Sequence, residues 1–464
     1  MVTSRPSDGY QWTQVSGLVK GEPSIGVIQP ASNIKDAAAA TYDIIVVGAS
    51  YYGLTAARDA VLTGLNALLL EGRDRIDIGE YPFEMGATWR EISRYNMREE
   101  LEISYDLTKG INEFSIESAE GRRSMSHDKE DILMDSALRK FFNIDGQNGK
   151  IAMPFPHSEG HNPDVKTYDK MSVADRVAQI KDELSADENT ALLSFILLCS
   201  CGTPDNTSFY ECLNWWALCN NSYEYCIECL IKYRFRHGQS SFAIRFFEEA
   251  VTTNRLSYSF STPAASIEDS DGRTSNALTV ISAVPLNVLN QIKFDPSLAD
   301  RKQAAAAVGH VNKCVKLHAE CRDPELRSWS GITYLNNQLL YAIADGTTPA
   351  GNTHIVAFGG QRNHLTPEED IQKTEKALQT MVPMDIERTV FHNWANDGFA
   401  KGAWFFSSPG FITKRLDDLR SRQGNIFFAN SDWAVEWRSF IDGAIEEGTR
   451  AAFAAKQDIA KRNI

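Results

Sequence analysis

The first clear pattern of apolar residues predicts a strand, a helix and a second strand in succession. Residues Tyr42–Val47 form an apolar run of strand length, and Asn66–Leu70 form another. Between them, Gly53–Thr63 carries small and apolar residues at helical spacing, and Gly64 follows as a C-terminal cap. Two strands joined by a crossover helix lie parallel in one sheet. We therefore expect a βαβ unit in this part of the chain.

Beyond this unit the pattern is mostly helical and then mostly extended, while residues 1–40 look irregular. Predicted helices include Met171–Leu184, Glu188–Cys199, a segment starting at Gly238 and a small-residue helix near Gly443; predicted strands include Leu256–Phe260, Ala277–Val284, Cys314–Glu320, His354–Gly359 and Asn425–Ala429. The segments predict an N-terminal arm (1–40), a nucleotide-binding domain (41–100, 236–310 and 396–464) and a second domain with a helical part (101–235) and a sheet part (311–395).

The turn after the first strand carries most of the pattern of a dinucleotide-binding site. Gly48, Ser50 and Gly53 occupy the three glycine positions of G-x-G-x-x-G, and Glu71 ends the next strand about 20 residues further on. In this pattern a pyrophosphate lies at the N-terminus of the helix. Because the middle glycine allows close approach of the backbone, Ser50 places additional atoms at that contact. The layout favours a flavoprotein over a nicotinamide dehydrogenase.

Composition and charge restrict the class of partner. The chain has 464 residues, too many for one ordinary core, with 43% hydrophobic and 23% charged residues. Its net charge of −14 argues against nucleic acid or an anionic membrane surface as partner. The sequence shows neither a signal peptide nor a run of roughly 18 apolar residues that could span a membrane. We expect a soluble intracellular protein, most simply a cytoplasmic one.

Six of the eight cysteines lie between Cys199 and Cys229. The pair Cys226 and Cys229 could form a zinc site together with Cys199 and Cys201. Their neighbours in the sequence are largely apolar, and in such surroundings a free cysteine behaves as a small apolar residue. We therefore favour buried structural thiols and predict no metal.

Several segments together resemble the flavin-containing amine oxidases, and most closely the soluble fungal-type monoamine oxidases. They are Glu71–Arg75 (Glu-Gly-Arg-Asp-Arg), Met85–Trp89 (Met-Gly-Ala-Thr-Trp), Lys401–Phe406 (Lys-Gly-Ala-Trp-Phe-Phe) and Phe428–Gly448. The resemblance covers nearly the whole chain. It implies an α/β fold in which a Rossmann-like FAD-binding domain of the amine oxidase type is interleaved with an α+β substrate domain. It also implies oxidative deamination of a small amine, with hydride transfer to FAD, imine hydrolysis and release of peroxide from dioxygen.

The same resemblance implies where FAD would be bound. Ala403 stands where some relatives carry a flavin-linking cysteine, so the cofactor is expected to be non-covalent. Glu71 would bind the adenosine ribose. The residues implied to contact FAD are Gly48, Ser50, Gly53, Glu71, Arg73, Gly86, Ala87, Ala264, Ser431, Asp432 and Ile441.

Three residues are the candidate catalytic groups. Trp404 and Phe440 match two aromatic residues that form a cage in front of the flavin, where they would orient the amine and exclude water. Lys313 resembles a lysine that holds a water near the flavin in some relatives. Taken singly, the aromatic residues are more typical of a core and Lys313 of a solvated surface.

The sequence departs from the family pattern around the cofactor. Apart from Ser50, the stretch Asp77–Glu80 replaces a Gly-Gly-Arg whose guanidinium meets the pyrophosphate, a contact ordinarily worth about 1.5–3 kcal/mol. The loop after Trp89 and the segment Ser266–Leu278 also look short. Two alternatives therefore stay open: a flavin-free homologue with non-redox chemistry on an amine or imine, and a non-catalytic binding protein.

Overall fold

The apolar run before the glycine turn forms β3 (Thr41–Val47), the middle strand of a parallel sheet. The computed structural model describes residues 9–21, 26–34, 41–76, 89–154, 162–268 and 276–462. Within them this sheet has five strands, in the order β18 (Ile426–Phe428), β11 (Asn276–Ser282), β3, β4 (Ala67–Leu70) and β9 (Leu256–Ser259). The parallel βαβ unit that the sequence predicts is therefore confirmed.

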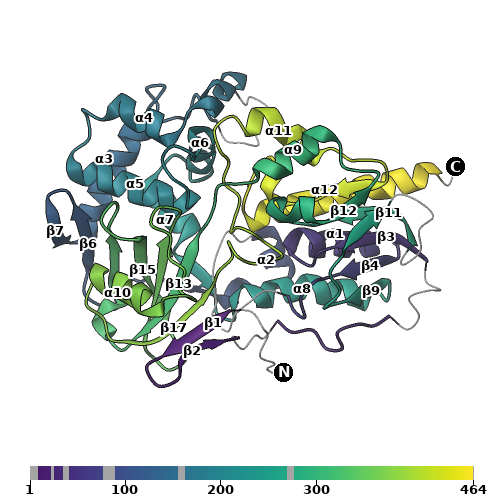
Figure 1. Ribbon diagram of the computed structural model, residues 1–464, viewed down its shortest axis with the longest axis horizontal. Coiled ribbons are helices and arrows are strands. Elements are labelled where there is room, and N and C mark those ends of the chain that lie inside the picture. The colour runs from purple at the N-terminus through teal and green to yellow at the C-terminus, as the bar shows by residue number, and fades with distance from the viewer. Residues whose placement is uncertain are drawn as a thin grey trace.

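Three long helices accompany this sheet (Figure 1): α1 (Tyr51–Leu62), α8 (Gly238–Thr252) and α12 (Ile441–Arg462). Gly64 follows α1 with a φ of +96°, as expected of a C-terminal cap. Helices α1 and α12 pack closely, because a Cβ at Gly448 would lie 2.5 Å from the carbonyl oxygen of Tyr52. This packing fixes the N-termini of both helices beside the carboxyl ends of the parallel strands.

A second sheet occupies the other side of the molecule and has nine strands among the described residues (Figure 1). Their order is β2 (Gly17–Lys20), β1 (Tyr10–Thr13), β17 (Ile386–His392), β13 (Val315–Cys321), β16 (Thr353–Gly359), β15 (Leu339–Thr347), β14 (Trp329–Ile332), β6 (Glu113–Ser118) and β7 (Gly121–Met125). All neighbouring pairs are antiparallel except β14 with β6.

The N-terminal arm differs from the irregular segment expected from the sequence. Residues 10–20 form the hairpin of β1 and β2, which extends the nine-stranded sheet through pairing of β1 with β17. The Tyr10 ring stacks on Phe391 with 5.3 Å between ring centroids, and Trp12 packs on the same core. The alternation of Tyr10 and Trp12 is the strand signal that the proline content of the arm obscured.

Helices cover both faces of the nine-stranded sheet. The helical part of the chain comprises α3 (His127–Phe142), α4 (Val173–Ile180), α5 (Ala186–Ser200), α6 (Phe209–Leu218) and α7 (Tyr223–Leu230), whereas α10 (Ile371–Met381) packs on a separate core cluster. Ser172 and Ser185 begin α4 and α5 with complete capping boxes, each with an acidic partner three residues later.

Smaller elements complete the described chain. They are α2 (Trp89–Arg94), α9 (Asp300–Val308), α11 (Ile412–Arg420), the strand pair β5 (Leu101–Ile103) and β8 (Tyr233–Phe235), the pair β10 (Ser266–Glu268) and β12 (Lys293–Asp295), and five short 3-10 segments. Among the described helices none is both long and apolar enough to cross a membrane.

Candidate functional site

A cavity of about 700 Å³ lies between the two sheets. One wall consists of the carboxyl ends of β3, β4 and β11 with the N-termini of α1 and α12, and the opposite wall contains residues of β13 and β17. Open parallel sheets bind their ligands beyond the carboxyl ends of the strands. The volume falls in the usual range for cofactor and small-molecule sites. This cavity is therefore the candidate functional site.

The glycine turn forms one end of the cavity, and its two outer glycines are required by packing. Gly48 has a φ of +108°, and a Cβ there would lie 2.2 Å from the carbonyl oxygen of Ala283. A Cβ at Gly53 would lie 1.9 Å from the carbonyl oxygen of Gly48. Gly53 thus allows close packing of the turn but does not line the cavity. Gly48 allows close packing and also lines the cavity.

Ser50 occupies the middle position and lines the cavity at the N-terminus of α1. Its side chain makes no capping hydrogen bond to the helix. The buried Oγ lies close to the Tyr52 hydroxyl but has no hydrogen-bond partner of normal geometry among the described residues. A buried polar atom without a partner calls for an explanation such as a bound ligand. The N-terminus of a helix favours an anion, because its first backbone N–H groups have no acceptor within the helix.

Glu71, at the end of β4, holds the turn in place. Its carboxylate accepts the backbone N–H of Ala49 at 2.6 Å and that of Arg73 at 2.8 Å. Burial raises the pKa of Glu71 despite these hydrogen bonds. Arg73 lines the cavity, but its guanidinium pairs with Asp397 at 2.7 Å. Although burial opposes ionisation, hydrogen bonds from His392 and Arg73 lower the pKa of Asp397.

The expected C-terminal cofactor residues also line the cavity. Ser431, Asp432 and Ile441 lie there, and so does Ala264 after β9. Burial raises the pKa of Asp432 to about 7, although the backbone N–H of Leu286 donates to its carboxylate at 3.2 Å. Helix α12 begins at Ile441, so its positive end faces the cavity. The expected contacts of Gly86 and Ala87 lie outside the described residues.

Of the three candidate catalytic residues, one is among the residues that line the described cavity. Trp404 lines the cavity, and its Nε1–H donates to the Cys199 carbonyl oxygen at 2.7 Å. Phe440 does not line it; its ring packs on Trp215 with 4.6 Å between centroids. Lys313 Nζ donates to the carbonyl oxygen of Lys401 at 3.2 Å in an exposed position and does not line the cavity either.

Residues that the sequence did not single out occupy the wall opposite the turn. Lys316 and His318 of β13 line the cavity, and His310 lies there as well. Burial lowers the pKa of His310 to about 3, and its Nδ1 accepts the Asn312 N–H at 3.3 Å. The alternation of Lys316 and His318 along a strand was the available signal, because residues two apart share one face.

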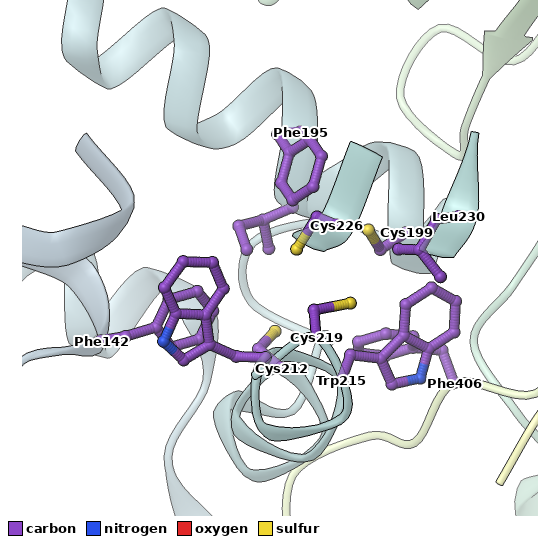
Figure 2. A pocket seen from close by; sticks show the side chains of 11 residues that line it. Phe142, Phe195, Cys199, Cys212, Trp215, Cys219, Cys226, Leu230 and Phe406 are labelled. Carbon is purple, nitrogen blue, oxygen red and sulfur yellow. The ribbon is translucent and has the colours of Figure 1, made fainter. Parts of the chain in front are cut away.

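The clustered cysteines surround a second, much smaller cavity of about 20 Å³. Figure 2 shows the sulfur atoms of Cys199, Cys212, Cys219 and Cys226 turned toward one space, together with aromatic rings including Trp215. Burial raises the pKa of the thiols of Cys199, Cys212 and Cys226, so these side chains stay protonated. No group of three metal-ligating side chains occurs in the described part of the chain. The arrangement is that of thiols packed in an apolar core.

Sequence comparison relates this chain to known enzymes. Residues 53–455 match the family described as flavin containing amine oxidoreductase. The chain is 27% identical to the pseudooxynicotine dehydrogenase of a Pseudomonas species, over 98% of this chain and 93% of the relative. It is also 26% identical to the nicotine dehydrogenase of Pseudomonas putida, over 90% of this chain and 88% of the relative.

Solved structures share the fold. A putrescine oxidase variant matches with a TM-score of 0.72 at 18% identity, covering 90% of this chain and 99% of its own. The cyclohexylamine oxidase of Brevibacterium oxydans matches with a TM-score of 0.70 at 16% identity, with the same coverage. The expected combination of a dinucleotide-binding α/β domain with a second, sheet-containing domain is therefore confirmed. Because the family match spans most of the sequence, the chain belongs to the flavin-containing amine oxidoreductases.

Proposed function

We propose that this protein catalyses the FAD-dependent oxidation of a small amine that carries one basic nitrogen. The observation that carries the proposal is a single cavity with two chemically different ends. One end is the turn with the buried Ser50 hydroxyl, which has no hydrogen bond of normal geometry among the described residues, and the other contains Trp404. Such a cavity suits a dinucleotide at one end and a small substrate at the other.

The residues at the turn fit the flavin dinucleotide that the family uses. The N-terminus of α1 and the Ser50 hydroxyl would hold the pyrophosphate, and Glu71 would accept a ribose hydroxyl. Ala264 would lie beside the adenine, while the positive end of α12 would favour electron density on the isoalloxazine ring. A bound flavin supplies the hydride acceptor for the amine. Ala403 provides no thiol for a covalent bond to it.

The charges in the cavity support a monoamine over a diamine. The acidic side chains that line its described part, Glu71 and Asp432, both lie at the cofactor end. Near Trp404 the cavity instead contains Lys316, whose ammonium lies 5.4 Å from the centroid of Phe358. Phe358 in turn lies 6.4 Å from Trp404, edge to face. A second substrate ammonium would meet like charge here, whereas an apolar or aromatic body would pack on the rings.

Trp404 would orient the substrate. Its indole is held by the hydrogen bond to the Cys199 carbonyl, so the ring presents a fixed face to the cavity. A fixed face excludes water and limits the orientations of the amine, which lowers the entropic barrier to reaction. Two relatives are named as dehydrogenases of pseudooxynicotine and of nicotine, and these names support an amine as the substrate.

The visible spectrum of the purified protein tests the cofactor, and turnover tests the reaction. Flavin bands near stoichiometry are expected, with oxidation of at least one amine among benzylamine, cyclohexylamine, nicotine and pseudooxynicotine. Oxygen uptake and reduction of an artificial acceptor, measured in parallel, distinguish an oxidase from a dehydrogenase. Protein that stays colourless after reconstitution with FAD would refute the proposal; amine turnover by such protein would support the flavin-free alternative.

Variants of the aromatic residues test the substrate end. Trp404→Ala is expected to lower kcat/KM by at least about tenfold, because misplacing the substrate by one ångström already has large effects. Phe440→Ala serves as the comparison, since its ring packs on Trp215 and is not among the residues that line the described cavity. Unchanged turnover in Trp404→Ala, with the flavin retained, would remove this residue from the site.

A further inference from the structure

Residues 394–402 form a compact loop after β17, here termed the flap. Its two ends meet, because the backbone N–H of Gly402 donates to the carbonyl oxygen of Trp394 at 2.9 Å. The carbonyl oxygen of Lys401, at the same end, accepts the side-chain amide of Asn287 at 2.9 Å. Short loops whose ends adjoin are compact units and often serve a function. The flap is therefore a separate unit attached to the body of the protein at a narrow neck.

The tip of the flap covers part of the cavity at its cofactor end. Gly398, Phe399 and Ala400 line the cavity, and so does Gly72, which directly follows the end of β4 and Glu71. A Cβ at Gly72 would lie 3.0 Å from the Phe399 ring, so the tip rests on the chain at this point. Phe399 is 46% exposed although it lines the cavity, which places its ring where the cavity meets solvent.

Asp397 connects the flap with the chain after β4, with β17 and with the N-terminal arm. Its carboxylate pairs with the Arg73 guanidinium at 2.7 Å and accepts the Phe399 backbone N–H at 2.8 Å. Nδ1 of His392 accepts the Gly9 N–H at 3.1 Å, so the ring proton is on Nε2. This Nε2–H donates to Asp397 at 2.8 Å. The three donors come from three different parts of the molecule and meet at one carboxylate.

The pair of Asp397 and Arg73 is the strongest of these contacts. Their side chains are only 6% and 13% exposed, so salt screens their attraction weakly. Burial opposes ionisation of Asp397, but hydrogen bonds from His392 and Arg73 lower its pKa, and the carboxylate is charged at neutral pH. The Arg73 guanidinium also lies 5.3 Å from the ring centroid of Phe399 and 5.9 Å from that of Trp394. The flap thus holds Arg73 by charge and by two aromatic rings.

We propose that the flap retains FAD in the cavity, and that the ion pair of Asp397 and Arg73 is the latch that must break before the flap opens. The inference rests on the proposed binding of FAD. The latch joins two groups of the protein, so it opposes the entry of FAD as well as its release. A conformational step of this kind slows association. A side chain that only binds FAD would slow release without slowing association.

The experiment measures the rate constants of FAD association and release in the wild type and in Asp397→Asn. This variant keeps the shape of the side chain and removes its charge. Association is followed by the change in flavin fluorescence on mixing FAD with apoprotein, and release by the reverse change on dilution of the holoenzyme. Both rate constants should rise about tenfold or more, because a charge-assisted hydrogen bond is lost. The dissociation constant should stay within about threefold, since the two changes offset each other.

The matched control removes the same charge just before β17. Asp385 pairs with Arg322 at 3.0 Å in an exposed position and does not line the described cavity. An exposed ion pair contributes little, so both rate constants of Asp385→Asn should stay within about twofold of the wild type. Unchanged rate constants in Asp397→Asn, or faster release without faster association, would overturn the latch.

A second variant tests the flap with the ion pair left in place. Phe399→Ala removes the exposed ring that rests on Gly72 and faces Arg73, so the fold should tolerate it. Both rate constants should rise about two- to fivefold, and wild-type values would overturn the retaining role of the flap even if Asp397→Asn does not fold. These outcomes are measured on protein that binds FAD. A wild type with no affinity for FAD would instead refute the proposed function, and the role of the flap with it.

Discussion

Ser50 provides the sharpest test of whether the turn binds a pyrophosphate. Its Oγ is buried, lines the cavity at the N-terminus of α1 and lacks a hydrogen-bond partner of normal geometry among the described residues. If a phosphate oxygen accepts its proton, the hydrogen bond is charge-assisted and worth about 1.5–3 kcal/mol. Ser50→Ala should therefore weaken FAD binding about 10- to 150-fold, at tenfold for each 1.4 kcal/mol.

The assay is titration of apoprotein with FAD, followed by flavin fluorescence or calorimetry. Ser50→Gly should lose the same hydrogen bond and bind FAD no more tightly than Ser50→Ala. The matched control is Ser282→Ala, which removes another buried hydroxyl without a partner, located on β11 outside the cavity lining. Its FAD affinity should equal that of the wild type. Tighter binding by Ser50→Gly than by the wild type would refute the reasoning and mark the serine as an obstruction.

Three further predictions concern stability. Gly53→Ala should lower the free energy of unfolding, measured in urea, by at least about 3 kcal/mol, because its Cβ meets a backbone oxygen at 1.9 Å. Gly64→Ala should lower it by about 1 kcal/mol, because a Cβ there meets open space and only the positive φ opposes alanine. Lys302→Met should lower the free energy of unfolding by about 1–3 kcal/mol, because the buried Nζ donates to three carbonyl oxygens at the end of α11. Burial lowers the pKa of Lys302 to about 7 and so offsets part of this stabilisation; wild-type stability in the same assay would contradict the prediction. Asp432 has a folded pKa of about 7, raised above its unfolded value by burial. The protonated carboxyl therefore stabilises the apoprotein most below pH 4, and this contribution is lost as the pH rises through 7. Asp432→Asn should thus be more stable than the wild type at pH 8 and equally stable at pH 4. A pH-independent difference in thermal unfolding between the two proteins would refute this.

The parts of the fold that the sequence predicts well are those decided by local pattern. Strand β3, helix α1 and strand β4 follow from apolar runs separated by glycine, because they are buried and adjacent in the chain. The hairpin of β1 and β2 could not be predicted in the same way, since its partner β17 lies more than 350 residues away and its own residues are half-buried. The break between α6 and α7 has a local cause: Asn220 and Asn221 both have positive φ angles, which asparagine tolerates.

The residues of the candidate site also differ in whether local sequence or distant contacts determine their positions. Gly48, Ser50 and Ile441 line the cavity, because short connections to the parallel sheet place them there; their contact with FAD stays a prediction. Lys313 precedes β13, where strand alternation does not yet fix the direction of a side chain, and its role stays a prediction. Lys316, inside the strand, is the lysine that reaches the cavity. The position of the Phe440 ring depends on its contact with Trp215 of α6, and the sequence alone does not show this contact because the two segments are far apart in the chain.

Some residues of the glycine turn are evidence for the fold, and one is evidence for a ligand. Gly48 and Gly53 are needed because a Cβ at either position would collide with the protein's own backbone, so this fold requires them whether or not a cofactor binds. Glu71, likewise, is occupied by two backbone N–H groups and stabilises the turn in either case. Ser50 differs, because the described protein gives its buried hydroxyl no hydrogen bond of normal geometry. Ser50 is therefore the residue of this turn that indicates a ligand, whereas Gly48 and Gly53 indicate only the fold.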